Sequence, residues 1–179
     1  ITGNQFEGSS EPGIVWVMQD VNGNLLPDDE WYELKGSETD KEETVQEYAV
    51  TYYRPAGPGM KVEWTDMNGK TGSIDYLIEY HSQPYYYPNW IKEDSYTLKG
   101  TCLKARNVQD PTTGFWDNQS FDWGYADNFG QDKADGDNAE AGPLQTYFKI
   151  GNAINRDGSP ANLKYIDFIK VQTGTNAKS

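Results

Sequence analysis

Short runs of strand-forming residues alternate with turn residues along most of the chain. Five runs are rich in Val, Ile, Leu, Tyr, Phe and Trp: residues 14–18, 31–34, 48–53, 96–105 and 164–171. Gly, Pro, Asn and Asp fill much of the chain between them, which is typical of loops. No segment has apolar residues at helical spacing. The pattern predicts an all-β fold, specifically a jelly-roll-like β-sandwich with long ordered loops, in a single domain over residues 1–179.

Two further patterns predict more detail. Residues 61–64 and 73–80 alternate between apolar and polar side chains and flank Asn68-Gly69. Because an Asn-Gly pair readily supplies the positive φ of a tight turn, these residues predict a β-hairpin. The last run, residues 164–171, has apolar residues on both faces, which predicts a central strand.

The charge balance narrows the classes of partner. The formal net charge is −13, from 15 Lys and Arg against 28 Asp and Glu. A field of this sign repels phosphate backbones and anionic membrane surfaces, so it argues against nucleic acid and favours either high solubility or cation binding. Cys102 is the only cysteine, which excludes a disulfide framework and a thiolate metal site. No apolar run is long enough to span a bilayer, so no direct membrane span is predicted.

Oxygen-bearing side chains recur at alternate positions after residue 19. Asp20, Asn22, Asn24 and Asp28 match positions 1, 3, 5 and 9 of a calcium loop, and the carbonyl of Leu26 matches position 7. Calcium takes about six to eight oxygen ligands, and a short loop can wrap it when alternate side chains turn inward. The loop lies between two strand-like runs with no nucleophile or base nearby. It therefore predicts a calcium ion that acts as a structural clip.

Two positions depart from a complete calcium loop. Leu25 stands at position 6, where Gly is usual, and Trp31 stands at position 12, where a bidentate Glu is usual. The missing carboxylate could come from Asp29, Glu30 or Glu33. The alternative interpretation is an ordinary Asn- and Gly-rich turn with solvated acids.

Two loop segments are rich in aromatic side chains. The first contributes Tyr85, Tyr86, Tyr87 and Trp90, and the second contributes Trp116, Trp123 and Tyr125. Loop aromatics can stack on a sugar face or a corrin ring, because they offer rigid apolar area at low entropic cost. We expect these side chains to bind a ligand. The alternative is that they pack over the core.

Two further candidate sites are a single histidine and a group of aspartates. His81, the only histidine, could ligate a metal, act as a base, or be an ordinary surface residue. Asp132, Asp135 and Asp137 could bind a second cation or form a solvated acidic loop. The sequence has no nucleophile elbow, HExxH motif or phosphate loop, so no enzymatic activity is predicted.

Motifs spread over nearly the whole chain are specific in combination: EPGIV (11–15), DVNGN (20–24), PDDEWYEL (27–34), YYRP (52–55), GTCLKARN (100–107), DWGYAD (122–127) and YIDFIKV (165–171). Together they resemble the Bacteroidetes "cell surface protein" family. That family usually has Gly at the position of Leu25, and its domains usually begin with upstream Gly-rich strands that are not seen here.

The resemblance implies export to the extracellular face of the outer membrane. It also implies capture of a corrinoid such as vitamin B12, in association with an outer-membrane transporter. The alternatives are a carbohydrate-binding or glycan-processing surface domain and a structural or adhesive module. A broad shelf beside amide-reading side chains would favour a corrinoid, whereas a narrow strip of coplanar aromatic rings would favour a glycan.

Overall fold

The computed structural model describes residues 1–134 and 145–178. Within them the chain is strand and loop, and the sole helical element is the three-residue 3-10 helix η1 (Ile150–Asn152). The strands pair antiparallel wherever their register is defined. The predicted all-β class is therefore confirmed, while the jelly-roll sandwich stays a prediction. None of the helical structure in the described part of the chain is long or apolar enough to cross a membrane.

The chain folds into two compact units. The first unit comprises Ile1–Thr44 and Cys102–Ser179, and the second comprises Val45–Thr101. The second unit is thus an insertion in the sequence of the first. The single domain over residues 1–179 stays a prediction.

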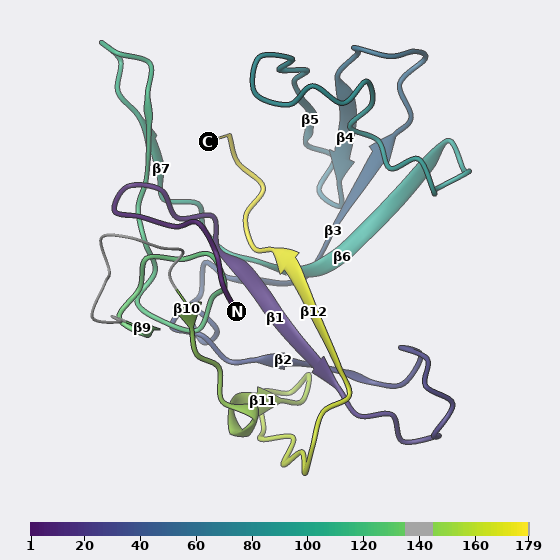
Figure 1. Ribbon diagram of the computed structural model, residues 1–179, viewed down its shortest axis with the longest axis vertical. Helices are drawn as coiled ribbons and strands as arrows, with labels where there is room; N and C mark the ends of the chain where they lie inside the picture. The colour runs from purple at the N-terminus through teal and green to yellow at the C-terminus, as the bar shows by residue number, and fades with distance from the viewer. Residues whose placement is uncertain (135–144, 179) are drawn as a thin grey trace. The chain divides into compact units, whose positions relative to one another are not determined.

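The first unit is built on a four-stranded sheet in the order β11-β2-β1-β12. Its strands are β1 (Gly13–Met18), β2 (Trp31–Leu34), β11 (Ala153–Ile154) and β12 (Phe168–Thr173). The two strands β1 and β12, purple and yellow in Figure 1, pair along their whole length, from Gly13 opposite Thr173 to Met18 opposite Phe168. Two small ribbons complete this unit: β7 (Asn107–Gln109) with β8 (Trp116–Asn118), and β9 (Lys133–Ala134) with β10 (Gln145–Thr146).

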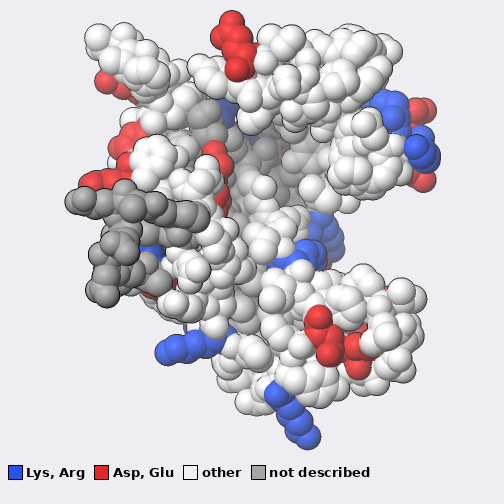
Figure 2. All heavy atoms as spheres, viewed as in Figure 1, with Lys and Arg blue, Asp and Glu red and all other residues white. Residues whose placement is uncertain are grey.

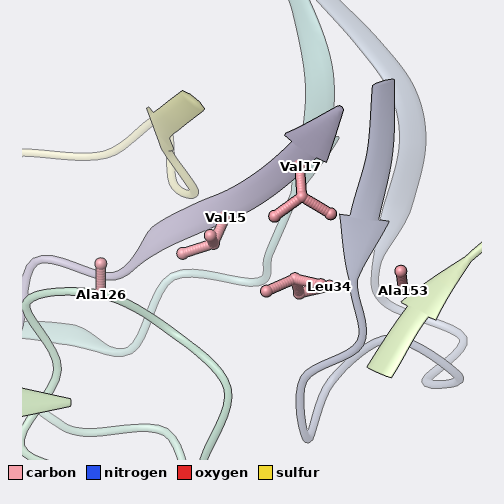
Figure 3. Close-up of a cluster of buried hydrophobic side chains, with 5 residues drawn as sticks. All are labelled: Val15, Val17, Leu34, Ala126 and Ala153. Atoms are coloured by element: carbon pink, nitrogen blue, oxygen red, sulfur yellow. The ribbon is translucent and has the colours of Figure 1, made fainter. Parts of the chain in front are cut away.

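Strand β1 is covered on both faces, which explains why almost all of its side chains are buried. On one face Val15 and Val17 point toward three small or branched side chains from other segments, Leu34, Ala126 and Ala153 (Figure 3). On the other face Ile14 packs in a cluster with Leu103, Phe121 and Tyr125. Strand β1 is one of the two inner strands of this sheet, and β2 is the other.

The prediction that residues 164–171 form a central strand is wrong. Strand β12 lies at the edge of its sheet and has β1 as its only partner strand among the described residues. Its register places Ile169 and Val171 beside Val17 and Val15, yet they are 58% and 49% exposed. Apolar side chains on both faces of this strand therefore do not mean that a neighbouring strand pairs with each of its two edges.

The second unit is a sheet in the order β5-β4-β3-β6. Its strands are β3 (Val45–Tyr53), β4 (Val62–Asp66), β5 (Thr71–Ile74) and β6 (Ser95–Cys102). The predicted hairpin is confirmed: β4 and β5 pair around a turn in which Gly69 has φ 80°. Asp66 fixes this turn, because its Oδ1 accepts the backbone N–H groups of Asn68 and Lys70 at 2.9 and 2.8 Å.

Candidate functional sites

The loop after β1 is folded around the carboxylate of Asp20. Its Oδ1 accepts the backbone N–H groups of Gly23 and Asn24, at 2.8 and 3.2 Å, and its Oδ2 accepts that of Leu25 at 2.9 Å. The N–H of Asp20 itself donates to Asp167 just before β12, at 2.8 Å. Position 1 of the predicted calcium loop therefore organises the backbone around it and ties the loop to the end of β12.

The other predicted side-chain ligands converge on Asp28. Asn24 Nδ2 donates to Asp28 Oδ2 at 2.9 Å, and Asn22 Nδ2 donates to Asp28 Oδ1 at 3.2 Å. The hydrogen bonds from Asn24 and then Asn22 hold the pKa of the Asp28 carboxyl below its ordinary value of 3.8. Both amide side chains thus lie within hydrogen-bonding reach of the Asp28 carboxylate, as alternate inward-facing positions predict.

Leu25 occupies the turn that usually requires Gly. Its φ is +61°, in the left-handed region, and its side chain is 81% exposed. The next residue, Leu26, is also exposed, and its N–H donates to Asn24 Oδ1 at 2.8 Å. The backbone therefore adopts the sharp turn despite the strain that a Cβ brings there.

The three candidates for an additional carboxylate ligand have different surroundings. Asp29 Oδ2 accepts the backbone N–H groups of Val21 and Asn22, at 3.0 and 3.4 Å. Glu30 Oε2 accepts the hydroxyl of Tyr32 at 3.0 Å. Glu33 is buried on β2. Asp29 is thus the candidate that already folds back over the loop.

The aromatic residues of the second unit do not share one surface. Trp90 is 79% exposed and Tyr85 is exposed, whereas Tyr87 is 2% exposed. Tyr87 donates its hydroxyl to the carbonyl of Glu93, and the guanidinium of Arg54 lies 4.6 Å from its ring centroid. Tyr87 is therefore a core residue, since its ring has no face open to a ligand.

Tyr86 is half-buried and has local structural contacts. Its hydroxyl accepts the N–H of Leu77 and donates to the carbonyl of His81, both at 3.0 Å. The imidazole of His81 meets the Tyr86 ring edge-on, with centroids 6.1 Å apart. His81 is solvent-exposed and its backbone is part of this turn.

The aromatic residues of the first unit also differ in how far they are buried. Tyr125 is buried, and its ring meets Phe121 edge-on at 5.5 Å. Trp116 is half-buried on β8, where it pairs with Gln109 of β7. Trp123 is exposed over 36% of its area. Of the predicted ligand-binding residues in this unit, only Trp123 presents a partly open ring beside a cavity.

That cavity has a volume of about 220 Å³. It is lined by aromatic, charged and amide side chains together with backbone: Leu34, Lys35, Trp123, Gly124, Asp132, Tyr147, Phe148, Lys149 and Asn152. Asp132 Oδ2 accepts the N–H of Gly124 at 2.7 Å, whereas its Oδ1 is buried without a hydrogen-bond partner. A buried carboxylate oxygen without a partner is energetically costly, and a ligand in the cavity could reach this one only if the lining moved.

Most residues that line the cavity were not predicted as site residues. Lys35, Tyr147 and Lys149 lie outside the aromatic and acidic segments that the sequence analysis singled out. Tyr147 is a large aromatic residue that is exposed in the structure. The sequence could not show this exposure, because Tyr147 lies in a short apolar run that also fits a buried segment. The proposed second cation site lies partly outside the described residues, because these exclude Asp135 and Asp137.

Within residues 1–134 and 145–178, no three His, Cys, Asp or Glu side chains gather closely enough to hold a metal ion. The loop around Asp20 and Asp28 falls outside such clusters, because two of its inward side chains are the amides of Asn22 and Asn24. Calcium accepts amide and backbone oxygens as well as carboxylates. The calcium ion stays a prediction.

No protein-family model matches the chain, and no curated protein matches it. The resemblance to a surface-protein family therefore stays a prediction from its motifs. Function is inferred below from the chemistry of the described side chains.

Proposed function

We propose that this chain is a non-catalytic ligand-binding domain of the bacterial cell surface, with one structural calcium ion in the loop between β1 and β2. The observation that supports it most directly is the convergence of Asn22 and Asn24 on Asp28, beside a turn organised by Asp20. Calcium prefers carboxylate oxygens, and this short loop carries two carboxylates, those of Asp20 and Asp28. A divalent cation would neutralise both.

The donor set fits calcium after a small rearrangement. The side-chain nitrogens of Asn22 and Asn24 now face Asp28, and rotation of each amide would present its oxygen instead. Carboxylate, amide and backbone oxygens in a flexible loop suit calcium better than magnesium, which demands a near-ideal octahedron. When bound, the ion would supply only rigidity. Asp20 and Asp28 would hold it and thereby fix the connection between β1 and β2.

The cavity beside Trp123 supports a ligand-binding role. Trp123 and Tyr147 line it together with polar residues that include Lys149 and Asn152, so one small site combines aromatic and polar side chains. A cavity of about 220 Å³ suits a single sugar residue or one substituent of a larger ligand. This observation favours the second candidate function, carbohydrate binding, whereas the family resemblance favours a corrinoid.

The location at the cell surface rests on the resemblance alone. The net charge of −13 supports a small-molecule or protein partner over nucleic acid. Acidic and basic side chains are interspersed on the face drawn in Figure 2. An outer-membrane transporter is the partner that the resemblance suggests, and association with it is part of the proposal.

Calorimetric titration with cobinamide, cyanocobalamin and a glycan panel tests the ligand class. Corrinoid binding would support the first candidate, and glycan binding alone would support the second. We expect Trp123→Ala to weaken binding by more than about 1 kcal/mol and to leave the melting temperature nearly unchanged, as for an exposed hot-spot residue. Trp90→Ala is the matched variant, because Trp90 is an exposed indole in the other unit.

The two variants separate the possible sites. Loss of binding in Trp90→Ala alone would move the site to the second unit. Absence of heat with every ligand, in calcium and in chelator, would contradict the proposed binding function and leave the structural or adhesive module.

A further inference from the structure

A second cavity of the first unit is lined almost entirely by charged and polar side chains. Its volume is about 320 Å³. Three of the lining residues are cations, Lys41, Lys104 and Arg106, and two are carboxylates, Glu38 and Glu43. The lining therefore carries one excess positive charge, in a chain whose net charge is −13.

Successive turns bring one side of the segment 38–44 against this cavity. The N–H of Lys41 donates to the carbonyl of Glu38 at 3.0 Å, and the N–H of Thr44 donates to the carbonyl of Lys41 at 3.1 Å. Hydrogen bonds between residues three apart place side chains i and i+3 above one another, so Glu38, Lys41 and Thr44 line the same cavity. The hydroxyl of Thr44 also donates to the carbonyl of Glu38, at 2.7 Å, which holds the segment in this form.

Glu38 is the buried anchor of the charged cluster. It is 6% exposed, and its two carboxylate oxygens accept Lys41 Nζ and Arg106 Nη2, both at 3.0 Å. A buried charge requires a partner of opposite sign, and one cation balances one carboxylate. The second cation therefore leaves an excess positive charge beside the cavity.

Arg106 is fixed in position and still has open donors. Its Nη1 donates to the carbonyl of Ser120 at 2.9 Å, and its guanidinium carbon lies 4.3 Å from the ring centroid of Phe121. A guanidinium has five N–H donors, of which the described chain fills two. The side chain is 31% exposed, so a small molecule can reach it. A planar fork held in this way suits the two oxygens of a carboxylate and loses little entropy on binding it.

Lys104 and Glu43 form the exposed side of the cavity. Lys104 Nζ and Glu43 Oε1 lie 3.5 Å apart, and the two side chains are 71% and 55% exposed, so this ion pair is weak. A hydrogen bond from its own backbone N–H, and then Lys104, hold the pKa of the Glu43 carboxyl below its ordinary value. Glu43 is therefore ionised at neutral pH and keeps lone pairs for the hydroxyl groups of a ligand.

We propose that this cavity binds one hexuronate, an acidic sugar whose carboxylate lies between Arg106 and Lys104. The hydroxyls of the sugar donate to Glu43 and to the exposed amide of Gln119. One excess cation in the lining matches one carboxylate, and a cavity of about 320 Å³ has room for one sugar ring. The site shares no lining residue with the cavity beside Trp123, so its occupancy is independent of the function proposed above.

The probes are glucuronate and galacturonate, titrated separately into the intact chain and followed by calorimetry. An ionic strength of about 0.15 M screens charges more than about 8 Å away, so the negative field of the whole chain acts little on the probe. We expect saturable binding at least about tenfold tighter than that of glucose, which lacks the charge, and of acetate, which lacks the hydroxyls. The amide resonances of residues 38–44 and 104–106 should shift along the titration.

Protein variants locate the site through the sign of their effects. Lys104→Gln should weaken uronate binding about tenfold, because it removes an attractive charge. Glu43→Gln should tighten it, because it removes a repulsive charge and keeps an acceptor oxygen. Lys61→Gln is the matched control, since Lys61 is an exposed lysine of the second unit paired with Glu63 at 3.2 Å. All three changes are at exposed side chains, and circular dichroism checks that the fold is kept.

Three results would overturn the proposal. The first is no saturable binding of either uronate at millimolar concentration. The second is binding of acetate as tight as that of the uronates, which would mean that the cations attract any carboxylate without recognising a sugar. The third is uronate binding that Trp123→Ala abolishes and Lys104→Gln leaves unchanged, which would assign the uronate to the cavity beside Trp123.

Discussion

The phenol oxygen of Tyr125 accepts a hydrogen bond from the backbone N–H of Glu38 at 2.9 Å, across 87 residues of sequence. The chain beside it leaves no space: a Cβ on Gly36 would lie 2.5 Å from Cζ of the ring. The pairing fixes the segment after β2 against the loop that carries Tyr125. Sequence analysis predicted Tyr125 as a ligand-binding residue, and its burial makes it a structural one.

Tyr125→Phe should lower the free energy of unfolding by about 1–3 kcal/mol, because the buried N–H of Glu38 loses its acceptor. Urea unfolding followed by circular dichroism measures the change. Tyr85→Phe is the control, since that ring is exposed. Equal stability of the Tyr125 and Tyr85 variants would show that water replaces the lost acceptor.

Alkaline pH should destabilise the protein through the same side chain. Burial raises the pKa of Tyr125 well above its ordinary value of 10.0. The unfolded chain therefore loses this proton first, and the stability contributed by the protonated phenol declines as the pH rises above about 10. Urea titrations between about pH 8 and 11 should show a shallower decline for Tyr125→Phe than for the unmodified chain.

Calcium should raise the free energy of unfolding by about 2.7 kcal/mol at a hundredfold excess over its dissociation constant, if the ion binds only the folded loop. Asp20→Ala should abolish this gain. Glu42→Gln is the control, because it removes one exposed negative charge elsewhere. Identical melting temperatures in calcium and in chelator would leave the loop as an ordinary polar turn.

The calcium effect should persist into moderately acidic solution. Hydrogen bonds from Asn24 and then Asn22 lower the pKa of Asp28 from 3.8, so this carboxylate remains charged at lower pH than an ordinary Asp. Its contribution is present above about pH 4 and is lost as the pH falls through the lowered pKa. Melting curves from pH 3 to 6 with and without calcium, compared with Asp28→Asn, measure this loss. Loss of the calcium effect already at pH 6 would argue against Asp28 as a ligand.

Leu25→Gly should stabilise the loop and tighten calcium binding. A non-Gly residue at φ +61° costs on the order of 1 kcal/mol, and the exposed Leu side chain has little packing to lose. Gly23→Ala is the opposite change, because it places a Cβ at φ +72° where space is open. Calorimetric calcium titration of both variants should move the affinity in opposite directions. Weaker binding in Leu25→Gly would mean that loop rigidity outweighs strain.

The parts of the fold that depend on residues close together in the sequence were predictable. The hairpin between β4 and β5 follows from Asn68-Gly69, and the inward convergence of Asn22 and Asn24 follows from their alternation. The place of β12 at a sheet edge depends on which distant strand pairs with it, and local pattern carries no such information.

The aromatic segments show the same limit more sharply. Tyr87 and Trp90 lie three positions apart in one Pro-rich segment, yet one is buried and the other is almost fully open to solvent. Irregular chain has no fixed side-chain period, so neither helical nor strand spacing could assign their directions. The cavity beside Trp123 was equally hidden, because its lining comes from four separated stretches of the chain.

The pairing of β1 with β12 also governs the order in which the protein can fold. Strand β1 ends at Met18 and β12 begins at Phe168, so about 150 further residues must be synthesised before β1 can meet this partner. Non-local pairing of this kind slows folding. Until β12 arrives, the run Gly13–Met18 is an apolar, β-prone segment with one side unpaired, which favours aggregation. A cell that makes this protein therefore needs to shield β1 while the residues between the two strands are synthesised.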